Sequence, residues 1–366
     1  MMLSAGNGFI MQSDKYSRDN AGQSLKKYTL LKKGELAYNH GASKAKQFGC
    51  CYELLEEEAR IPYVYHCFKV QDTEYTPYVA LELNNTKMDK QLKRLVSSSV
   101  RMDGLLNISY DEYMSVVIYL PAYAEQKHIA DFLEKLDMRI AKQEQLIEAL
   151  KKYKRGVFEA VFSRKLPLVP KARQSDWAAF KLRDFATRIT RKNNGATDIP
   201  LTISAQYGLI DQRDFFSKVV ASTDMSEYYL LRQGEYAYNR STSNDYPFGS
   251  IKRLELYNEG TVSPLYLCFA IKEKVVLSDF AKWYFESSQW HRGINEICAE
   301  GARNHGLLNV PIDGFFNTVH ILPCDIEEQA RIAAFLSQIH DKLTQAQEEL
   351  EKLNSMRNGL MQQLFI

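Results

Sequence analysis

Two long stretches with a heptad repeat constrain this chain more than any other feature. The first runs from Tyr123 to Phe162 without an internal proline, and its apolar residues recur on alternating three- and four-residue steps. This spacing is typical of the a/d seam of a coiled coil. A helix of that length would extend ~60 Å. The seam comprises Ile129, Leu133, Leu136, Ile140, Ile147, Leu150, Val157 and Val161, with Gln143 and Lys154 as interruptions.

The chain also supplies a partner for this seam. The stretch from Ile326 to Phe365 repeats the pattern when 203 is added to each seam position, and the interruptions correspond as well: Gln143 maps to Ala346 and Lys154 to Arg357. A single heptad helix would indicate only a generic coiled coil. Two copies in register within one chain favour an intramolecular helix pair. The second seam comprises Ile332, Leu336, Ile339, Leu343, Ala346, Leu350, Leu353, Leu360 and Leu364.

The regions ahead of the two helices are duplicated too. Their offset in residue number rises slowly from 200 to 203 along the chain, so only three one-residue changes in loop length separate the copies. The chain is therefore a tandem duplication of a globular region plus a long helix. The clearest matches pair Gly34–Asn39 with Gly234–Asn239, Phe48–Gly49 with Phe248–Gly249, Tyr65–Phe68 with Tyr266–Phe269, Gly104–Asn107 with Gly306–Asn309, and Leu120–Pro121 with Leu322–Pro323.

Each globular region is expected to mix strands and helices. The apolar runs Tyr63–Val70 and Leu265–Ile271 have the composition of strands. Val79–Val96 and Asp279–Ala299 are predicted helices. The predicted fold class is α+β, with two repeated mixed α/β domains joined by two long antiparallel coiled-coil helices. The predicted boundaries are a first domain at 1–122, a helix at 123–163, a linker at 164–176, a second domain at 177–324 and a helix at 325–366.

Two details refine this layout. Asp325 and Glu328 have the spacing of a capping box at the start of the second long helix. The second domain also has a lead, Trp177 to Thr202, that precedes its aligned part, and the first domain has no matching residues ahead of Met1. We therefore expect the first domain to lack its opening strand or strands.

Composition narrows the class of protein further. A chain of 366 residues with 45% hydrophobic and 25% charged residues is typical of a multidomain globular protein. The net charge of +2 permits nucleic-acid binding only through local clusters of basic residues. No segment is typical of a signal peptide or a membrane span, so a cytoplasmic location without membrane contact is expected. The six cysteines lack the spacing of a zinc site and are expected to be reduced and mostly buried.

Several catalytic signatures are missing from the sequence. There is no Gly-x-x-x-x-Gly-Lys-[Ser/Thr] loop, no Gly-x-Gly-x-x-Gly fingerprint and no Asn-Pro-Pro-Tyr-like box, since no two prolines are adjacent. No cluster of carboxylates with a lysine indicates a metal-dependent nuclease. We therefore predict no catalytic residue, no metal site and no cofactor on this chain.

The duplicated layout resembles the specificity subunit of type I restriction–modification systems. The resemblance covers nearly the whole chain. It depends on a Leu-Pro followed by Glu-Gln at each long helix and on the two Gly-Leu-Leu-Asn boxes. These motifs are Leu120-Pro121 with Glu125-Gln126, Leu322-Pro323 with Glu328-Gln329, and the boxes Gly104–Asn107 and Gly306–Asn309.

The resemblance implies a non-catalytic protein with two target-recognition domains. Each domain would read one half of a bipartite, asymmetric site in double-stranded DNA. The long helices would act as a ruler and as a dock for two methyltransferase subunits. A restriction subunit with translocase activity would complete the complex. S-adenosylmethionine, ATP and Mg²⁺ would be bound by these partner subunits. The first domain departs from the family in lacking this lead, so either the true start lies upstream or this is a naturally shortened or rearranged form.

Candidate DNA contacts follow the repeated strands and precede the Gly-Leu-Leu-Asn boxes. Arginine and lysine suit phosphates or guanine, and asparagine suits adenine. Solvated turns are the alternative for the loops, the repeated Tyr-Asn pair could be structural, and Arg101 and Arg303 could share a salt bridge. The candidates are Arg191, Lys192, Asn193, Asn239, Arg240, Ser241, Ser243, Lys252, Arg253 and Arg303 in the second half, and Asn39, His40, Lys44, Lys46 and Arg101 in the first.

Three other functions stay open from sequence. A truncated specificity subunit could read only one half-site. A coiled-coil adaptor could bind proteins through its globular ends. A nuclease would show metal-dependent cleavage by the purified chain alone. DNA binding that weakens steeply with salt would separate the DNA readers from the adaptor.

Overall fold

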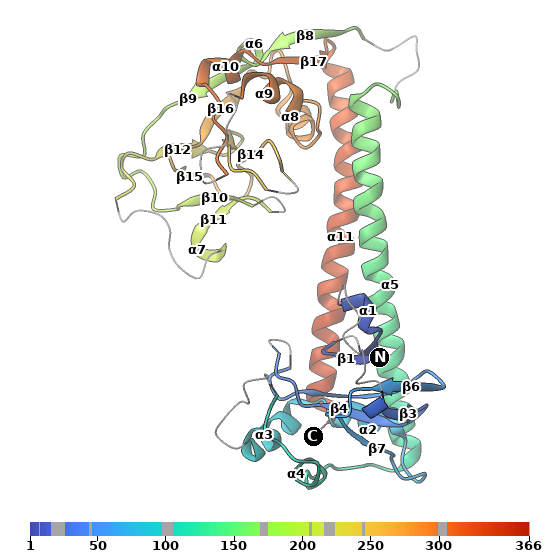
Figure 1. Cartoon of the computed structure of the whole chain (residues 1–366). Helices are drawn as coiled ribbons and strands as arrows, with labels where there is room; N and C mark the ends of the chain where they lie inside the picture. The colour runs from blue at the N-terminus through green and yellow to red at the C-terminus, as the bar shows by residue number, and fades with distance from the viewer. Residues whose placement is uncertain are drawn as a thin grey trace. The chain divides into compact units, whose positions relative to one another are not determined.

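The chain folds into two compact units. Unit 1 comprises Met1–Leu146 and Gln347–Ile366, and unit 2 comprises Ile147–Ala346. Each unit thus holds one globular region together with parts of both long helices (Figure 1). The computed structural model describes residues 1–6, 8–15, 26–43, 46–96, 105–168, 175–204, 207–215, 224–243, 246–298 and 306–365. The predicted DNA contacts Lys44, Arg101 and Arg303 lie outside these residues.

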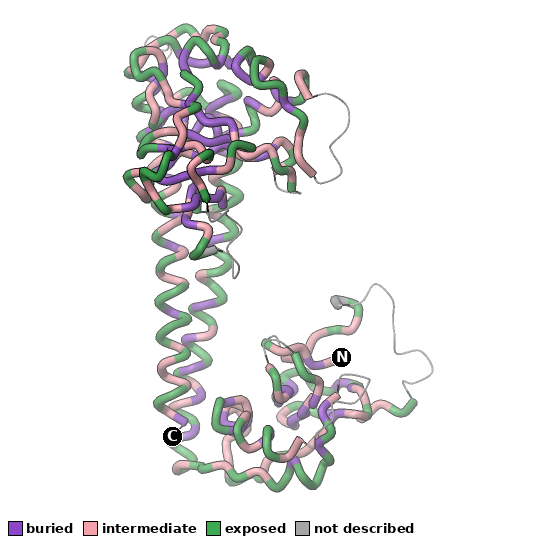
Figure 2. The backbone as a smooth tube through the Cα atoms, turned by 90° about the vertical axis from the view of Figure 1, so that its left-hand side faces the viewer, coloured by how far each residue is buried: buried purple, intermediate pink, exposed green. Residues whose placement is uncertain are grey.

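The two heptad stretches form long helices, α5 (Tyr123–Phe162) and α11 (Ile326–Leu364). Figure 2 shows buried residues recurring along both helices, as the seam predicts. In unit 1, Leu136 and Ile140 pack against Leu353. In unit 2, the C-terminal turns of α5 share a core with the N-terminal turns of α11. The helices are therefore antiparallel, which confirms the prediction.

The polar interruptions of the two seams pair across the helices. In unit 2, Lys154 Nζ lies 3.2 Å from His340 Nδ1. In unit 1, the guanidinium of Arg357 binds the carboxylate of Asp137 at two points. The two pairs are equivalent, because each residue of one is 203 positions from a residue of the other. Polar residues at seam positions restrict a helix pair to one register.

A buried glutamine ties each long helix to its globular region. Gln126 accepts the Tyr75 N–H at 2.9 Å and donates to the Pro121 carbonyl at 2.8 Å. Gln329 accepts the Leu277 N–H at 2.8 Å and donates to the Pro323 carbonyl at 2.9 Å. These are the glutamines of the two Glu-Gln motifs, and both are fully buried. The motif therefore fixes how each long helix leaves its domain.

Unit 2 is built around a four-stranded antiparallel sheet with the order β14-β13-β16-β9. Three two-stranded antiparallel ribbons, β10-β11, β12-β15 and β17-β8, complete its strands. Its elements are β8 (Trp177–Lys181), α6 (Leu182–Phe185), β9 (Ala186–Ile189), β10 (Leu201–Ser204), β11 (Gly208–Asp211), α7 (Gln212–Phe215), β12 (Tyr229–Arg232), β13 (Tyr236–Asn239), β14 (Ser250–Arg253), β15 (Glu259–Val262), β16 (Leu267–Ile271), α8 (Ser278–Phe285), α9 (His291–Ile297), α10 (Ile312–Asn317) and β17 (Val319–Pro323).

Unit 1 repeats this plan with fewer strands. Its central sheet has three strands in the order β5-β4-β7, and β1-β2 and β3-β6 form two ribbons. Its elements are β1 (Met2–Ser4), β2 (Gly8–Ile10), α1 (Gln12–Lys15), β3 (Thr29–Lys32), β4 (Leu36–Asn39), β5 (Cys50–Glu53), β6 (Glu58–Ile61), β7 (His66–Phe68), α2 (Thr76–Glu82), α3 (Thr86–Leu95) and α4 (Tyr110–Met114).

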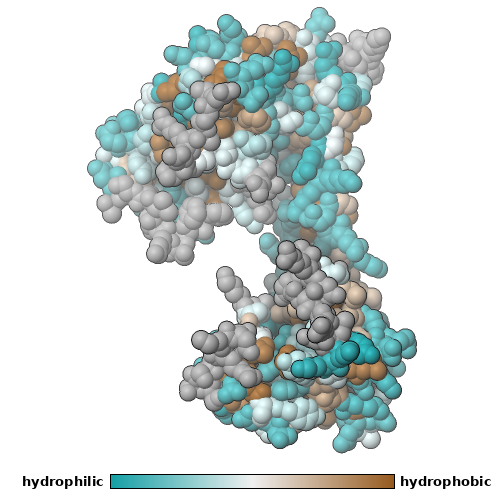
Figure 3. Space-filling view, in the orientation of Figure 1, coloured by the Kyte–Doolittle hydropathy of each residue, from teal (hydrophilic) through white to brown (hydrophobic). Residues whose placement is uncertain are grey.

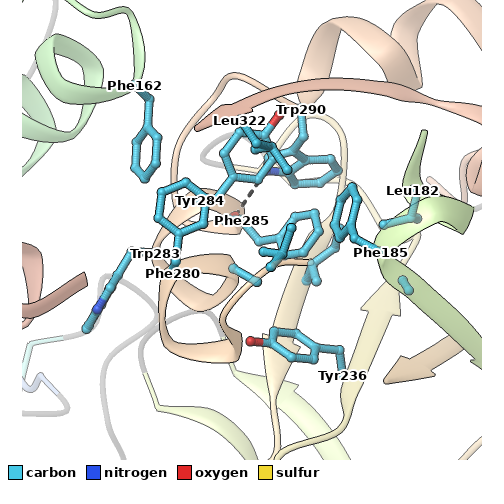
Figure 4. Packing of buried hydrophobic residues seen from close by; sticks show 14 of the residues in the cluster. Phe162, Leu182, Phe185, Tyr236, Phe280, Trp283, Tyr284, Phe285, Trp290 and Leu322 are labelled. Carbon is cyan, nitrogen blue, oxygen red and sulfur yellow. Dashed lines mark hydrogen bonds between the residues drawn. The ribbon is translucent and has the colours of Figure 1, made fainter. Parts of the chain in front are cut away.

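The hydrophobic cores of the two units differ in size and composition. In unit 2 one continuous cluster joins the sheet, α8, α9, α10 and the ends of both long helices. Figure 4 shows part of this cluster, including the rings of Phe185, Phe280, Trp283, Tyr284, Phe285 and Trp290. A second, smaller cluster lies on the other face of that sheet. Unit 1 likewise buries one cluster on each face of its central sheet, and its cluster beside the helices is smaller than that of unit 2.

Three details of the predicted secondary structure are wrong. Each predicted helix before the long helices is two short ones, α2–α3 and α8–α9. In unit 1 the break occurs because Asn85 caps α3, accepting from the N–H groups of Lys87 and Met88 at 2.9 and 2.8 Å. The strands β7 and β16 are shorter than the predicted runs. The capping box is absent, since Glu328 instead accepts from Ser175 N and from Trp177 Nε1, at 2.7 and 3.2 Å.

None of the helices in the described part of the chain is long and apolar enough to span a membrane.

Candidate nucleic-acid interface

The loop after β4 and its counterpart after β13 are built in the same way. Asn39 accepts the N–H of Gly41, and Asn239 accepts the N–H of Ser241, both at 3.0 Å. This confirms that the repeated Tyr-Asn pair is structural, as one reading of the sequence held. Whether Asn39 and Asn239 also contact bases stays a prediction.

A tyrosine and a glycine close each loop on its far side. The Tyr38 hydroxyl donates to the Phe48 carbonyl at 2.6 Å, and the Tyr238 hydroxyl donates to the Phe248 carbonyl at 2.8 Å. The glycine that follows has a positive φ in both units, and an added Cβ would collide with the backbone of the preceding loop. Only glycine fits there, which explains why Phe-Gly recurs in both repeats.

The structure brings each loop beside a Gly-Leu-Leu-Asn box. Isolated bridges join Gly41 to Leu105 and Ser241 to Leu307. In unit 2, Thr242 also donates from its N–H and its hydroxyl to the Gly306 carbonyl, at 2.8 and 2.9 Å. The loop after the central strand and the Gly-Leu-Leu-Asn box, which were predicted separately as DNA contacts, therefore lie side by side at one edge of the unit. Ser241 and Ser243 are exposed on it.

His40 and Arg240 occupy equivalent positions, and one of the two carbonyls that each side chain contacts, that of Val64 or Leu265, is equivalent as well. His40 is buried, with Nδ1 at 2.8 Å from the Leu106 carbonyl and Nε2 at 3.0 Å from the Val64 carbonyl. Arg240 donates to the Leu265 carbonyl at 2.9 Å and to the Val310 carbonyl at 3.4 Å. Both side chains connect the loop to neighbouring segments. Their predicted contacts with DNA are untested, and His40 would have to leave its pocket to make one.

The side chains of the basic loop after β9 also form ion pairs and hydrogen bonds within unit 2. Arg191 forms an ion pair with Glu235 at 2.7 Å, and Lys192 pairs with Glu227 at 3.2 Å and lies over the Tyr229 ring. Asn193 is buried and exchanges two hydrogen bonds with the backbone of Thr197. These three side chains are therefore bonded within unit 2, and DNA contacts from Arg191, Lys192 and Asn193 stay predictions.

The proposed phosphate clamps have partners as well. Lys252 is buried in an ion pair with Glu286. Arg253 pairs with Glu255 and Asp279, each at 2.7 Å. Lys252 and Arg253 lie at the C-terminal end of β14. Asn239 pairs with the other end of this strand, at Ser250. In unit 1, Lys46 donates to the Asn84 carbonyl at 2.7 Å.

A basic helix face that sequence reasoning missed lies on α3 of unit 1. Its four cations are exposed and form no hydrogen bond or ion pair with another described residue. At 100° per residue they occupy an arc of roughly 120°, opposite the buried Met88 and Leu92. The spacing could have revealed this face, had the break at Asn85 been recognised. The four residues, which we call the α3 basic face, are Lys87, Lys90, Lys93 and Arg94.

The α3 basic face adjoins the loop described above. The bond from Lys46 to Asn84 places the β4–β5 loop next to the start of α3, and Cys51 N donates to Asn84 Oδ1 at 3.1 Å. The equivalent helix of unit 2, α9, has no such face, because Arg292 pairs with Glu296 at 2.8 Å. Hydrophilic residues dominate the surface shown in Figure 3 in both units. The free cations of unit 1 could bind phosphates.

The described residues contain no group of three or more His, Cys, Asp or Glu side chains placed to hold a metal ion. The six cysteines are free, and Cys50, Cys51 and Cys268 are buried. Burial raises the pKa of the Cys51 and Cys268 thiols to about 12, so these thiols are protonated and poor nucleophiles at neutral pH.

Comparison with known proteins places this architecture among solved structures. No protein-family model matches the chain, and no curated protein matches it in sequence. The HsdS subunit from Thermoanaerobacter tengcongensis is similar over 92% of this chain and 81% of its own, with 13% identity and a TM-score of 0.50. The S subunit of a type I restriction–modification system from M. genitalium is similar over 93% and 85%, with 13% identity and a TM-score of 0.54.

A third similar chain comes from a structure concerning complex assembly and conformational transition of the type I R-M system. It covers 92% of this chain and 83% of its own, with 12% identity and a TM-score of 0.52. At such low identity the likeness establishes the fold. The predicted fold class, two repeated mixed domains with two long antiparallel helices, is thereby confirmed.

Proposed function

We propose that this chain is the DNA-specificity subunit of a type I restriction–modification complex. The observation that carries the proposal is the duplicated fold, which matches S subunits over more than nine-tenths of the chain. In this role each unit reads one half of a bipartite, asymmetric site in double-stranded DNA. Because the loops of the two units differ in sequence at equivalent positions, the two half-sites differ as well.

The chemistry of the complex belongs to its partners. Two methyltransferase subunits bind S-adenosylmethionine, and a restriction subunit with translocase activity uses ATP and Mg²⁺. The long helices of this chain are the docking elements for the methyltransferases. The exposed faces of α5 and α11 offer polar surface for partners.

In unit 1 the DNA-binding surface combines the loop after β4, which contains Lys46, with the α3 basic face. In unit 2 it is the edge formed by Asn239–Ser243 and the Gly-Leu-Leu-Asn box. Ion-paired residues such as Arg253 would have to exchange a carboxylate for a phosphate, which costs desolvation. The four cations of the α3 basic face bear no such cost, so we expect them to supply most of the phosphate contacts of unit 1.

The deciding experiment co-expresses the chain with a matching methyltransferase subunit and maps methylated adenines across the genome. A split, non-palindromic motif supports the proposal. A motif with one defined half restricts reading to one unit and favours a half-site specificity subunit. A stable complex without methylation favours a coiled-coil adaptor. If no complex forms, the proposal fails. DNA cleavage by the purified chain with a divalent metal would instead indicate a nuclease.

A charge variant tests the α3 basic face within the same complex. Replacing Lys87, Lys90, Lys93 and Arg94 by glutamine should reduce the slope of log K against log salt by about 3 to 4, if all four contact phosphates. The methylated DNA motif should not change. The matched control replaces four exposed lysines outside the long helices and the proposed DNA surface, Lys26, Lys27, Lys32 and Lys165. An equal change in slope for the control would show that the effect is general charge.

A further inference from the structure

One position after the central strand fastens the following loop to the Gly-Leu-Leu-Asn box in both units. His40 follows β4, and Arg240 follows β13. The backbone carbonyl of each accepts the N–H of the second leucine of the box, Leu106 at 2.8 Å or Leu308 at 2.9 Å. The side chain of each also contacts two backbone carbonyls. The two units therefore share this attachment but make it with different side chains.

The hydrogen bonds of His40 define its protonation state. Nδ1 lies 2.8 Å from the carbonyl oxygen of Leu106, and Nε2 lies 3.0 Å from the carbonyl oxygen of Val64. A carbonyl oxygen only accepts hydrogen bonds, so each ring nitrogen needs its own hydrogen to form both contacts. A neutral imidazole carries one such hydrogen, and the imidazolium carries two. The geometry is therefore that of a positively charged side chain, and this side chain is only 5% exposed.

Unit 2 places a permanent cation at the equivalent position. Arg240 donates to the Leu265 carbonyl, the equivalent of the Val64 carbonyl, at 2.9 Å. Its second acceptor is the Val310 carbonyl at 3.4 Å. Arginine keeps its charge and all its donors at any physiological pH. Histidine supplies a charge and two donors only while it is protonated.

The side chains around His40 leave its charge to be stabilised by carbonyl groups. In the described ranges His40 forms no ion pair with a carboxylate. The titratable groups that face it are Tyr38 of β4 and His66 of β7, with ring centroids at 6.3 and 5.0 Å. Beyond His66 lie Tyr110 and Tyr113 of α4, whose ring centroids are 5.8 and 6.1 Å from that of His66.

Of the two neighbouring histidines, only His40 needs a charge. His66 uses one nitrogen, Nε2, which donates to the Ile108 carbonyl at 3.0 Å. Burial lowers the pKa of His66, and the nearby His40 acts in the same direction. Burial also raises the pKa of Tyr38 and of Tyr113, so both phenols are neutral in the range where histidine titrates. The group therefore holds one positive charge, on His40.

We propose that His40 is a positioning residue that holds the loop after β4 in a proton-dependent way. With both ring nitrogens protonated, it ties the loop to the Gly-Leu-Leu-Asn box and to the turn at Val64. When one proton leaves to water, one buried carbonyl faces a bare ring nitrogen and loses its donor, which favours release of the loop. The attachment is complete in mild acid and weakens as the pH rises through the ordinary range of histidine, near 6.5.

The attachment in unit 2 does not respond to pH in this range, because Arg240 stays charged. If the chain reads DNA as proposed above, contacts of unit 1 with its half-site weaken at alkaline pH, whereas those of unit 2 do not. That consequence rests on the proposed function. The proton-dependent attachment itself does not, and it is tested on the full chain without DNA.

Nitrogen-15 NMR of the chain labelled at histidine tests the protonation state directly. At pH 6.0 His40 should show two protonated ring nitrogens, and His66 should show one protonated and one bare nitrogen. The resonances of His40 are identified by their loss in His40→Gln. A bare ring nitrogen on His40 at pH 6.0 would overturn the proposal.

Amide hydrogen exchange measures how firmly the loop is held. The protection of the Leu106 N–H is divided by that of its equivalent Leu308, so that the intrinsic effect of pH on exchange cancels. Loss of one buried hydrogen bond should lower this ratio about tenfold between pH 6.0 and pH 8.5. A ratio that stays constant would refute the proposed role of His40.

Two matched variants identify the residue that titrates. His66→Gln keeps a donor for the Ile108 carbonyl and should retain the tenfold change. His40→Gln cannot titrate, so its ratio should be low and independent of pH. A pH dependence that survives His40→Gln or disappears in His66→Gln would assign the effect to His66 and overturn the proposal. The His66→Gln result decides alone if circular dichroism shows that His40→Gln does not fold.

Discussion

The two units share a fold but differ in what fills and surrounds their sheets. Unit 2 holds all three tryptophans, Trp177, Trp283 and Trp290, and buries His320 among aromatic rings. Unit 1 stacks Tyr38 on Tyr113, and its cluster on the helix-covered face of the sheet is smaller than that of unit 2. A duplicated topology therefore does not require cores of equal size. Stability is expected to be unevenly distributed, with unit 2 the more tightly packed.

The two units should differ most in the free energy of unfolding that is lost when equivalent core phenylalanines are replaced by alanine. Phe269→Ala removes a fully buried ring from unit 2 and should lower the free energy of unfolding by about 3–5 kcal/mol. Phe68→Ala, in the half-buried equivalent of unit 1, should cost about 1–2 kcal/mol. Urea titration followed by tryptophan fluorescence reports on unit 2, and hydrogen exchange reports on unit 1. Equal losses would contradict the uneven packing.

Acid should destabilise unit 2 before unit 1. Burial lowers the pKa of His320 to about 4, and burial with the neighbouring Lys154 lowers the pKa of His340 to about 4. The unfolded chain, with an ordinary histidine pKa of 6.5, then binds protons more readily than the folded chain. Stability should therefore be constant above pH 6.5 and fall as the pH drops toward 4. For His320 the full loss is about 3 kcal/mol.

Tryptophan fluorescence during unfolding at pH 7 and pH 5 measures this loss. The matched control is His320→Gln, which keeps polar contact with Tyr284 and Thr318 but cannot titrate there. Its stability should depend less on pH. In unit 1 the pKa of His66 is lowered in the same direction, mainly by burial, but the side chain is only half-buried, so a weaker acid response is expected. A steeper acid response in unit 1 would refute this ordering.

The smallest expected changes in stability come from mutating the two equivalent polar pairs between the long helices. The two changes are expected to have opposite signs. Arg357→Met breaks a partly exposed ion pair with Asp137 and should cost about 0.5–1 kcal/mol. Lys154→Met removes a lysine whose pKa is lowered by burial, and should leave stability unchanged or raise it by up to about 1 kcal/mol. Urea midpoints of the two variants measure both changes. A loss for Lys154→Met above that for Arg357→Met would show that its contacts with Phe158 and Trp283 dominate.

Much of the architecture could be predicted because repetition and heptad spacing are properties of the sequence itself. The helix break at Asn85 could not, since it depends on two backbone N–H groups that a side chain caps. The burial of His40 escaped prediction for a related reason: a polar residue after a strand is typical of an exposed loop, and only tertiary contacts with the Val64 and Leu106 carbonyls reveal its pocket. Ion pairs such as Arg253 with Asp279 likewise join residues from different elements.

The equivalence of the Lys154–His340 and Arg357–Asp137 pairs has a consequence for how two copies of a single repeat would pair. If the first repeat paired with a second copy of itself in the same antiparallel register, Asp137 would face Lys154 at both ends of the helix pair, with opposite charges each time. Two copies of the second repeat would instead place His340 against Arg357. In charge terms the first repeat is a self-complementary homodimer half and the second is not. Two copies of the first repeat are therefore compatible with the charges of this register, and Lys154 beside His340 shows that a cation facing this imidazole is tolerated in the present chain.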